Sequence, residues 1–298
     1  MEQKIIQWFP GHMSKATREI KEKIDLVDLL IELVDARCPI SSRNPVVSEL
    51  KSKKRIIVMT KIDLADKEIT KEWKEYFKKQ DIICLDMNLN GKVDIKEIVR
   101  WANEAMKEKL ERDARRGIRN RPIRAMVVGI PNVGKSTFIN KVIGRKAASV
   151  ANKPGQTKSQ QWVKNGNVEL LDTPGILWPK FEDKEVGVRL ALIGSIKDNI
   201  LNQDKLADIL LEFLATNYKS SLEARYNIVV DKEIDIEYIN DLFANIAKNR
   251  GLLISGGEPD IDRAKELVLK EFRDGKIVNA SLERCDIDGW IRVWEWVL

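Results

Sequence analysis

The chain contains a loop of the type that binds nucleotide phosphates. Its sequence, Gly-Ile-Pro-Asn-Val-Gly-Lys-Ser, covers residues 129–136 and follows an apolar segment at 125–128. The glycines let the backbone curl so that its amides point at phosphate oxygens, and the helix expected from Lys135 adds its positive N-terminal end. We expect Lys135 to reach the β- and γ-phosphates and Ser136 to bind Mg²⁺. The phosphate contacts expected from this segment are Asn132, Val133, Gly134, Lys135, Ser136 and Thr137.

A second group of residues lies downstream, where it could sense the terminal phosphate. The sequence Asp-Thr-Pro-Gly at 172–175 follows an apolar segment at 168–171. Asp172 would hold Mg²⁺ through water, and the amide of Gly175 would meet the γ-phosphate. Thr157 lies between this group and the loop, and it would bind Mg²⁺ only while the γ-phosphate is present. Thr157 is therefore the candidate switch residue.

The sequence Thr60-Lys61-Ile62-Asp63 is a candidate for reading a purine base. A carboxylate accepts from both N1–H and N2–H₂ of guanine, whereas adenine offers no such pair, so Asp63 favours guanine. Lys61 would lay its aliphatic stem along the base. Thr60 stands where asparagine is usual, and its shorter reach leaves its contacts open. A further loop should cover the base edge after the segment at 82–85, with Asn88 as the candidate contact.

These elements occur in an unusual order, because the base-reading group precedes the phosphate loop. In an ordinary small GTPase it comes last. The sequence Ser-Ile-Lys-Asp at 195–198 is no better candidate, because no strand precedes it. The chain after Gly175 therefore runs directly into the C-terminal part instead of returning to the sheet. We hypothesise that nucleotide state sets the orientation or mobility of residues 180–298, and through it RNA affinity.

The elements that must position these groups can be read from hydrophobic periodicity. Short apolar runs predict strands at 29–34, 55–59, 82–85, 125–128 and 168–171, and helices are expected at 68–79, 93–109 and 135–143. Strands that alternate with helices imply an α/β fold with a mostly parallel sheet covered on both faces.

The C-terminal part has a different pattern. Apolar residues at three- and four-residue spacing predict helices at 206–214, 236–247 and 261–272. We expect a phosphate-loop domain at 1–178, with an N-terminal extension at 1–24 and a basic linker at about 112–121. A smaller all-α domain should follow at 179–298. Its terminal tryptophans, Trp290, Trp294 and Trp296, favour packing over ligand binding.

Charge is distributed unevenly along the chain of 298 residues. Of 52 Lys and Arg, 17 lie after residue 178, together with 23 of 46 Asp and Glu, so that part has net charge −6 and the preceding part +12. A basic half favours a polyanionic partner such as nucleic acid, although charge alone leaves this open. The three cysteines form no metal-binding spacing and no disulfide framework. With neither a signal core nor an apolar run long enough for a membrane span, we expect a cytoplasmic protein.

Taken together, the motifs resemble the circularly permuted GTPases of the ribosome biogenesis GTPase A (RbgA/YlqF) family over essentially the full length. The resemblance is carried by residues 9–13 (Phe-Pro-Gly-His-Met), 35–37 (Asp-Ala-Arg), 42–45 (Ser-Arg-Asn-Pro), 60–63, 129–136, 154–157 (Pro-Gly-Gln-Thr) and 172–175. It implies a bacterial assembly factor that binds rRNA on a late precursor of the large ribosomal subunit and leaves after GTP hydrolysis. It also implies RNA contacts by the helical domain, although the net charge of that part is negative. We expect a monomer that binds no DNA.

The catalytic group is not evident from the motifs. Ile176 occupies the position where Ras-like proteins have the glutamine that orients water, so intrinsic hydrolysis should be slow. The resemblance implies that His12 swings to the γ-phosphate on the ribosome, although His12 could equally cap an aromatic cluster with Trp8 and Phe9. Asn132 resembles the asparagine that binds K⁺ in related GTPases, or it could only stabilise the loop. The candidate catalytic residues are His12, Lys135, Thr157 and Gly175.

Two other interpretations remain open. The chain could be a phosphate-loop phosphotransferase acting on a small substrate, although no residue that would activate an acceptor is visible. It could also be an RNA-binding module in which GTP is only a ligand and hydrolysis is incidental. Our main hypothesis is a GTPase that turns over slowly alone, favours K⁺ over Na⁺ and is accelerated by large ribosomal subunits.

Overall fold

The structure is a computed structural model. It describes residues 18–48, 53–91, 93–118, 121–144, 162–165, 167–173, 175, 177, 183–198 and 201–285. Several residues singled out in the sequence, among them His12, Thr157, Ile176 and the three C-terminal tryptophans, lie outside these ranges.

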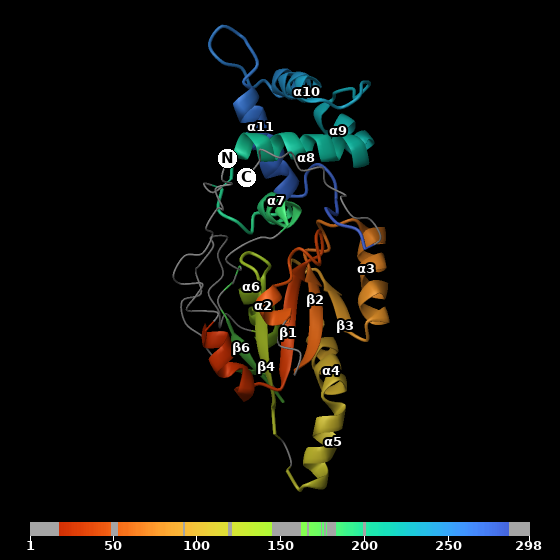
Figure 1. Ribbon diagram of the computed structural model, residues 1–298, viewed down its shortest axis with the longest axis vertical. Coiled ribbons are helices and arrows are strands. Elements are labelled where there is room, and N and C mark those ends of the chain that lie inside the picture. Colours follow the sequence, from red (N-terminus) through yellow and green to blue (C-terminus); the bar gives the residue numbers. More distant parts are fainter. Residues whose placement is uncertain are drawn as a thin grey trace.

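A six-stranded sheet forms one end of the molecule, in the order β3-β2-β1-β4-β6-β5 (Figure 1). Neighbouring strands are parallel except for β5, which pairs antiparallel with β6. The strands are β1 (Leu29–Asp35), β2 (Lys54–Thr60), β3 (Ile83–Met87), β4 (Ile123–Gly129), β5 (Trp162–Asn165) and β6 (Val168–Asp172). The predicted α/β class, the mostly parallel sheet and the five predicted strands are confirmed.

Side chains of the central strand β1 alternate between two hydrophobic layers, as a strand buried on both faces requires. Leu29, Ile31 and Leu33 pack in a cluster that includes residues of α4 (Ile95–Ala105) and α6 (Lys135–Ile143). Leu30 and Val34 face the other way, toward the helical residues 18–23 and α3 (Lys67–Lys79) respectively. The sheet is therefore covered on both faces, and its loops converge at the carboxyl ends of the parallel strands.

Two local predictions differ from the structure. Strand β5 is not predicted by the sequence, because its four residues form no apolar run and it joins the sheet through its antiparallel pairing with β6. The helix expected at 93–109 is divided at Met106 into α4 and α5 (Lys107–Arg115). Since α5 continues through Arg115, the first residues of the linker predicted at about 112–121 are helical, and the linker itself stays a prediction. The polar composition of α5 concealed the helix, which is largely exposed.

Beyond the carboxyl ends of β1 and β2, a group of helices, α7 to α11, stacks at the other end of the molecule (Figure 1). They are α7 (Lys184–Leu192), α8 (Gln203–Asn217), α9 (Lys219–Tyr226), α10 (Ile236–Asn249) and α11 (Ile261–Arg273). The three helices predicted from periodicity are confirmed as α8, α10 and α11. The division into two domains stays a prediction, because one continuous cluster of buried apolar side chains joins these helices to the sheet.

A segment after α11, residues 280–284, returns to the sheet side of the molecule; we call it the C-terminal strap. Its backbone amides donate to carbonyl oxygens in the loops after β2 and β1: Ala280 to Leu64 at 3.0 Å and Leu282 to Arg37 at 2.6 Å. The carboxylate of Glu283 accepts from the amides of Ile40 and Ser41 and from the Ser41 hydroxyl. The strap therefore ties the helical part to the loops that carry the base-reading residues.

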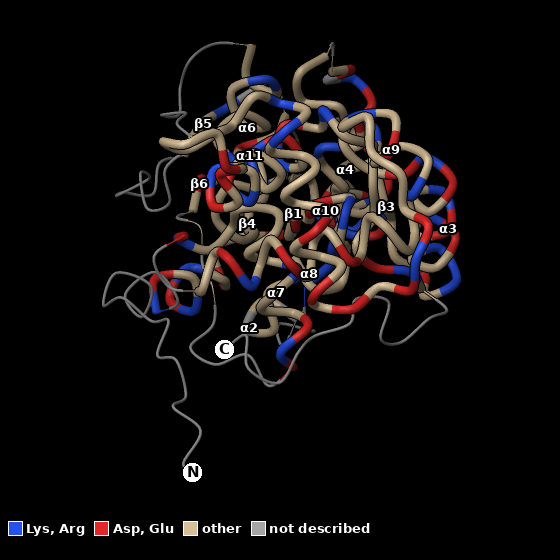
Figure 2. The backbone as a smooth tube through the Cα atoms, turned by 90° about the horizontal axis from the view of Figure 1, so that it is seen from above, with Lys and Arg blue, Asp and Glu red and all other residues tan. Residues whose placement is uncertain are grey.

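Basic and acidic residues are mixed at short range along single helices, within the net basic charge of residues 1–178 and the net acidic charge of the rest. Figure 2 shows basic and acidic residues alternating along α3, for example. Within the described ranges, no helix has the length and apolar character needed to cross a membrane.

Candidate nucleotide-binding site

The phosphate loop connects β4 to α6, and its glycines are required by close packing. A side chain on Gly129 would place its Cβ 2.7 Å from the carbonyl oxygen of Leu33 on the neighbouring strand. Gly134 has φ of +101°, and a Cβ there would lie 2.9 Å from Leu89 Cδ1. Asn132 has a left-handed backbone with φ of 59°. The backbone curl expected of a phosphate-binding loop is thus present between strand and helix.

Lys135 is held in place by its own loop. Its Nζ donates to the carbonyl oxygens of Gly129 at 3.0 Å and Ile130 at 2.7 Å. Burial lowers the pKa of Lys135 to about 8, although the nearby Asp172 acts to raise it. A Cβ on Gly175 would lie 3.0 Å from this Nζ, so Gly175 lies directly beside the lysine. Lys135 from the phosphate loop and Asp172 and Gly175 from the end of β6 and just after it therefore form one cluster.

Asp172 ends β6 and provides an oxygen suited to a hard cation. Its Oδ1 is buried and accepts from no group among the described residues. Burial raises the pKa of Asp172 to about 6, against the lowering effects of Lys135 and of the Thr173 backbone. Ser136, in the first turn of α6, adds a hydroxyl to the same edge of the sheet. Carboxylate and hydroxyl oxygens are the donors that Mg²⁺ prefers, so these residues fit that ion.

The base-reading group follows β2. Thr60 is buried, and its hydroxyl lies 3.1 Å from the carbonyl oxygen of Val34 and 2.7 Å from that of Val133. It therefore links the end of β1 to the phosphate loop and does not line the pocket. Asp63 lies at the pocket wall, where its Oδ1 is buried and has no hydrogen-bond partner among the described residues.

Lys61 is held by an ion pair with the buried carboxylate of Asp35. Its Nζ lies 3.1 Å from Oδ2 of Asp35, which also accepts from Arg37 Nη2 at 2.8 Å. Burial acts to raise the pKa of Asp35, but Arg37 and Lys61 overcome it and hold that pKa well below its ordinary value. This cluster explains the Asp-Ala-Arg motif at 35–37 as the support of the base-reading lysine.

In the loop after β3, Asn90 lines the pocket, whereas the sequence suggested Asn88. Asn88 forms a turn, its Oδ1 accepting from the amides of Asn90 at 2.8 Å and Gly91 at 3.2 Å. Asn90 lines the pocket, and its Nδ2 donates to Asp63 Oδ2 at 3.0 Å. The Asn-Leu-Asn sequence carries no signal that separates the two asparagines, because the turn geometry decides which one turns inward.

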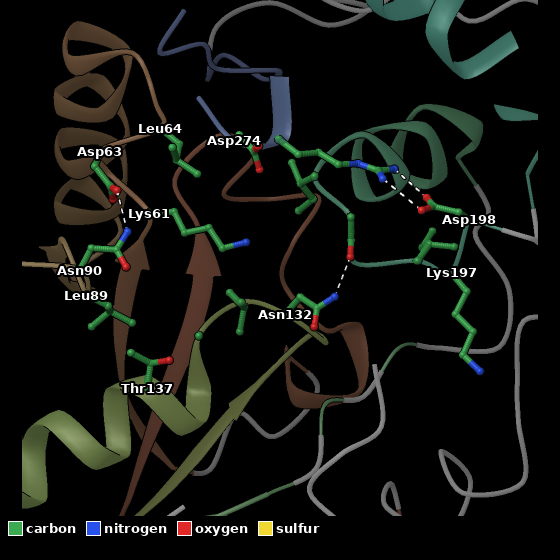
Figure 3. Close-up of a pocket in the computed structure, with 16 residues that line it drawn as sticks. Lys61, Asp63, Leu64, Leu89, Asn90, Asn132, Thr137, Lys197, Asp198 and Asp274 are labelled. Carbon is green, nitrogen blue, oxygen red and sulfur yellow. Dashed lines mark hydrogen bonds and ion pairs between the residues drawn. The ribbon is translucent and has the colours of Figure 1, made fainter. Parts of the chain in front are cut away.

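The base-reading group and part of the phosphate loop line a cavity of ≈ 590 Å³, whereas Lys135, Ser136, Asp172 and Gly175 are not among the residues that line it. In Figure 3, Asp63 and Asn90 lie on one side, Lys61 lies between them and Asn132, and Asp198 lies on the far side. The wall formed by the sheet loops comprises Lys61, Asp63, Leu64, Leu89, Asn90, Asn132, Val133, Gly134 and Thr137. The pocket therefore brings together the predicted base-reading carboxylate and the phosphate loop, which are far apart in the chain.

Sequence reasoning missed the other wall, which comes from the helical part. It comprises Ile193, Gly194, Ile196, Lys197, Asp198, Arg273 and Asp274. Arg273 is fixed there by Asp198, at 2.8 and 3.2 Å, and by the carbonyl oxygen of Ala191 at 2.9 Å. A helix, α7, rather than a strand precedes residues 195–198, and it is the docking of α7 and α11 that brings Ile196, Lys197 and Asp198 to the pocket.

Comparisons with known proteins identify the family. A family model described as "50S ribosome-binding GTPase" matches residues 124–239. "Ribosome biogenesis GTPase A" of Bacillus cereus is 49% identical over 281 residues, covering 94% of this chain and 94% of that protein. The protein of the same name from Thermotoga maritima is 36% identical over 282 residues, again 94% of each.

A solved structure agrees with these relatives. The chain resembles the "Crystal structure of GNP-bound YlqF from T. maritima" with a TM-score of 0.67 and 30% identity, over 92% of this chain and 100% of that one. The sequence relatives and the structure span nearly the same length, from the sheet to the helical part. The chain therefore belongs to the ribosome biogenesis GTPase A family.

Proposed function

We propose that this protein hydrolyses GTP as an assembly factor for the large ribosomal subunit, and that nucleotide state controls its binding to rRNA and its release. The observation that supports the proposal most directly is that Asp63 and the phosphate-loop residues Asn132 to Gly134 line one pocket. A guanine nucleotide presents a base edge with two N–H donors at one end and phosphates at the other. The pocket offers a carboxylate and a phosphate loop in the same arrangement.

Next to the pocket, the phosphate loop and the end of β6 carry groups that could stabilise the negative charge of the transition state. Lys135 would turn from the carbonyl oxygens of its own loop to the β- and γ-phosphates, where its charge is needed. Ser136, Thr157 and Asp172 would hold Mg²⁺, which neutralises phosphate charge when bound. The amide of Gly175, beside Lys135, would donate to the γ-phosphate.

Asn132 is oriented in a way that suits a K⁺ ligand. Its Nδ2 donates to the carbonyl oxygen of Gly194 at 2.8 Å, so the amide plane is fixed and Oδ1 is left as the oxygen available to a cation. K⁺ at this position would supply positive charge where other GTPases use an arginine finger. The helical part would thus help to set the monovalent-ion preference of the phosphate loop.

The ribosomal partner is proposed from the relatives. Those in Bacillus cereus and Thermotoga maritima are named ribosome biogenesis GTPases, and the family model is described as ribosome-binding. The excess of basic residues before residue 179 favours rRNA as the contact. We propose that the protein acts as a monomer in the cytoplasm, where bacterial ribosomal subunits are assembled.

Co-sedimentation tests this partner. The protein with a non-hydrolysable GTP analogue should migrate with large ribosomal subunits in a sucrose gradient, and the GDP form should bind more weakly. Identical binding in the two forms would remove the coupling between nucleotide and subunit. An RNA-binding module that uses GTP only as a ligand would bind but show no multiple turnover on subunits. A phosphotransferase would accept ATP as readily as GTP.

Hydrolysis should be slow alone and accelerated by large subunits. His12 is the chain's single histidine and the candidate group that orients water on the ribosome. A His12→Ala variant should keep its slow intrinsic turnover and lose most of the stimulation. Full stimulation of that variant would remove His12 from the mechanism, and the ribosome itself would then supply the missing group.

A further inference from the structure

The base-reading carboxylate has an intramolecular partner that no motif predicts. Asn90 Nδ2 donates to Oδ2 of Asp63 at 3.0 Å, whereas Oδ1 of the same carboxylate is buried without a partner among the described residues. A buried carboxylate oxygen that accepts no hydrogen bond is costly unless a ligand supplies the donor. Asp63 is therefore held through Oδ2, and its Oδ1 is an acceptor that the described residues leave unfilled at the wall of the pocket.

The backbone at Asn90 is held by contacts that do not involve Asp63. Its backbone amide is bound by Oδ1 of Asn88, and the next residue is fixed by Lys141 of α6, whose Nζ donates to the carbonyl oxygen of Gly91 at 2.8 Å. Leu89 is buried and packs against Gly134 of the phosphate loop. The loop is thus built on α6 and the phosphate loop, and it presents Asn90 to Asp63 from a fixed frame.

A fixed carboxylate plane matters for guanine. The base offers N1–H and N2–H₂ side by side, so both carboxylate oxygens must lie in the plane of the purine to accept both hydrogen bonds. The terminal torsion of an aspartate is broad, and a free carboxylate would lose rotational freedom on binding. Each carboxylate oxygen has two lone-pair sites, so Oδ2 can accept from Asn90 and from the base together.

We propose that Asn90 is a positioning residue for guanine recognition, acting through Asp63 by fixing the orientation of its carboxylate. This inference rests on the proposed nucleotide site. Hydrogen bonds to charged groups are among the stronger ones, but Asn90 is exposed to solvent, which weakens its contribution. The expected effect of removing it is a loss of about tenfold in GDP affinity.

The test compares GDP, IDP and ADP binding by the full-length wild type and by an Asn90→Ala variant. Inosine lacks the 2-amino group, so it makes one hydrogen bond to the carboxylate where guanine makes two. Asn90→Ala should weaken GDP binding about tenfold and IDP binding less than about threefold. The preference for GDP over IDP, measured as the ratio of the two affinities, should therefore fall. Asn240→Ala, an exposed asparagine on α10, is the matched control and should change neither.

A double-mutant cycle establishes that the effect passes through Asp63. In an Asp63→Ala background, Asn90→Ala should have no further effect on GDP affinity. Equal weakening of GDP and IDP that persists in this background would show a general loop role and overturn the proposal, as would unchanged GDP affinity of Asn90→Ala. If the wild type fails to distinguish GDP from ADP, the guanine site itself is wrong, and the proposed function fails with it.

Discussion

The side-chain amide of Asn132, in the phosphate loop, donates to the carbonyl oxygen of Gly194 just after α7, across 2.8 Å. This hydrogen bond joins the two walls of the nucleotide pocket directly. It makes the position of the helical part a determinant of how the phosphate loop is oriented. The phosphate loop and the helical part are therefore coupled in two ways. The chain after Gly175 runs directly into the helical part, and the hydrogen bond from Asn132 to Gly194 joins the two non-covalently.

Loss of this contact should alter the response to monovalent cations. Asn132→Ala removes both the amide held by Gly194 and the oxygen proposed to bind K⁺. GTP turnover of the wild type should be faster in KCl than in NaCl, and the variant should bring that ratio to about 1. Turnover in the two salts at equal ionic strength measures it, with Asn240→Ala as control. A K⁺ preference that survives in Asn132→Ala would place the cation elsewhere.

The C-terminal strap should contribute measurably to stability through Glu283. This side chain is 8% exposed and accepts three hydrogen bonds from Ile40 and Ser41. Glu283→Ala removes the acceptor of these donors, of which those of Ser41 are buried, and this should cost about 2 kcal/mol and lower Tm by roughly 5 °C. Glu283→Gln keeps one acceptor oxygen, so its Tm should lie between those of the wild type and of Glu283→Ala.

Thermal unfolding followed by circular dichroism gives the comparison, with the exposed Glu233→Ala as control. A Tm for Glu283→Ala within a degree or so of the control would mean that the strap contributes little to stability.

The buried Asp35 cluster should make stability depend on pH in the acid range. Because Arg37 and Lys61 lower the pKa of Asp35 below its ordinary 3.8, this group stabilises the fold at higher pH, and that contribution is lost as the pH falls below 3.8. Asp35→Asn leaves two cations without their counter-charge and should cost about 3 kcal/mol near neutral pH.

The difference in Tm between wild type and Asp35→Asn should therefore stay the same from pH 7 to pH 5 and shrink as the pH is lowered from about 4 toward 2. The exposed Asp241→Asn variant should show no such trend. A difference that stays constant over this range would mean that the cluster is held by packing rather than by charge.

Gly175 should discriminate between the two nucleotide states. A Cβ at this position would lie 2.8 Å from Pro131 Cα and 3.0 Å from Lys135 Nζ, so alanine must push the chain away from the phosphate loop. Gly175→Ala should weaken a non-hydrolysable GTP analogue at least about tenfold and GDP less than about threefold, because only the former needs the γ-phosphate contact.

Equilibrium binding of fluorescent nucleotide analogues measures both affinities. Gly91→Ala is a suitable control, because a Cβ there would meet only ordinary contacts at 3.6 to 3.8 Å. Equal weakening of both nucleotides by Gly175→Ala would show that the glycine shapes the loop without sensing the γ-phosphate.

Local pattern was sufficient for much of this protein. The apolar runs predicted β1, β2, β3, β4 and β6. For central strands such as β1 and β4 the reason is that strands buried on both faces must be continuously apolar. The phosphate loop could be recognised because its backbone conformation requires glycine at fixed positions, and those glycines are visible in the sequence. Strand β5 and helix α5 escaped because an exposed element has little periodic apolar signal.

The pocket was decided by tertiary structure. No local pattern places Gly194, Asp198 and Arg273 opposite Asp63, since these contacts join segments distant in the chain and depend on how α7 and α11 dock. Asn90 rather than Asn88 lines the pocket because of the turn that Asn88 forms, which Lys141 of α6 holds at Gly91. The sequence by itself determined which residues can bind phosphate and base, through rules that act over a few residues. Only the packing of the two parts decided what surrounds them, because that packing is a sum of many weak contacts that leave no signature at any one position.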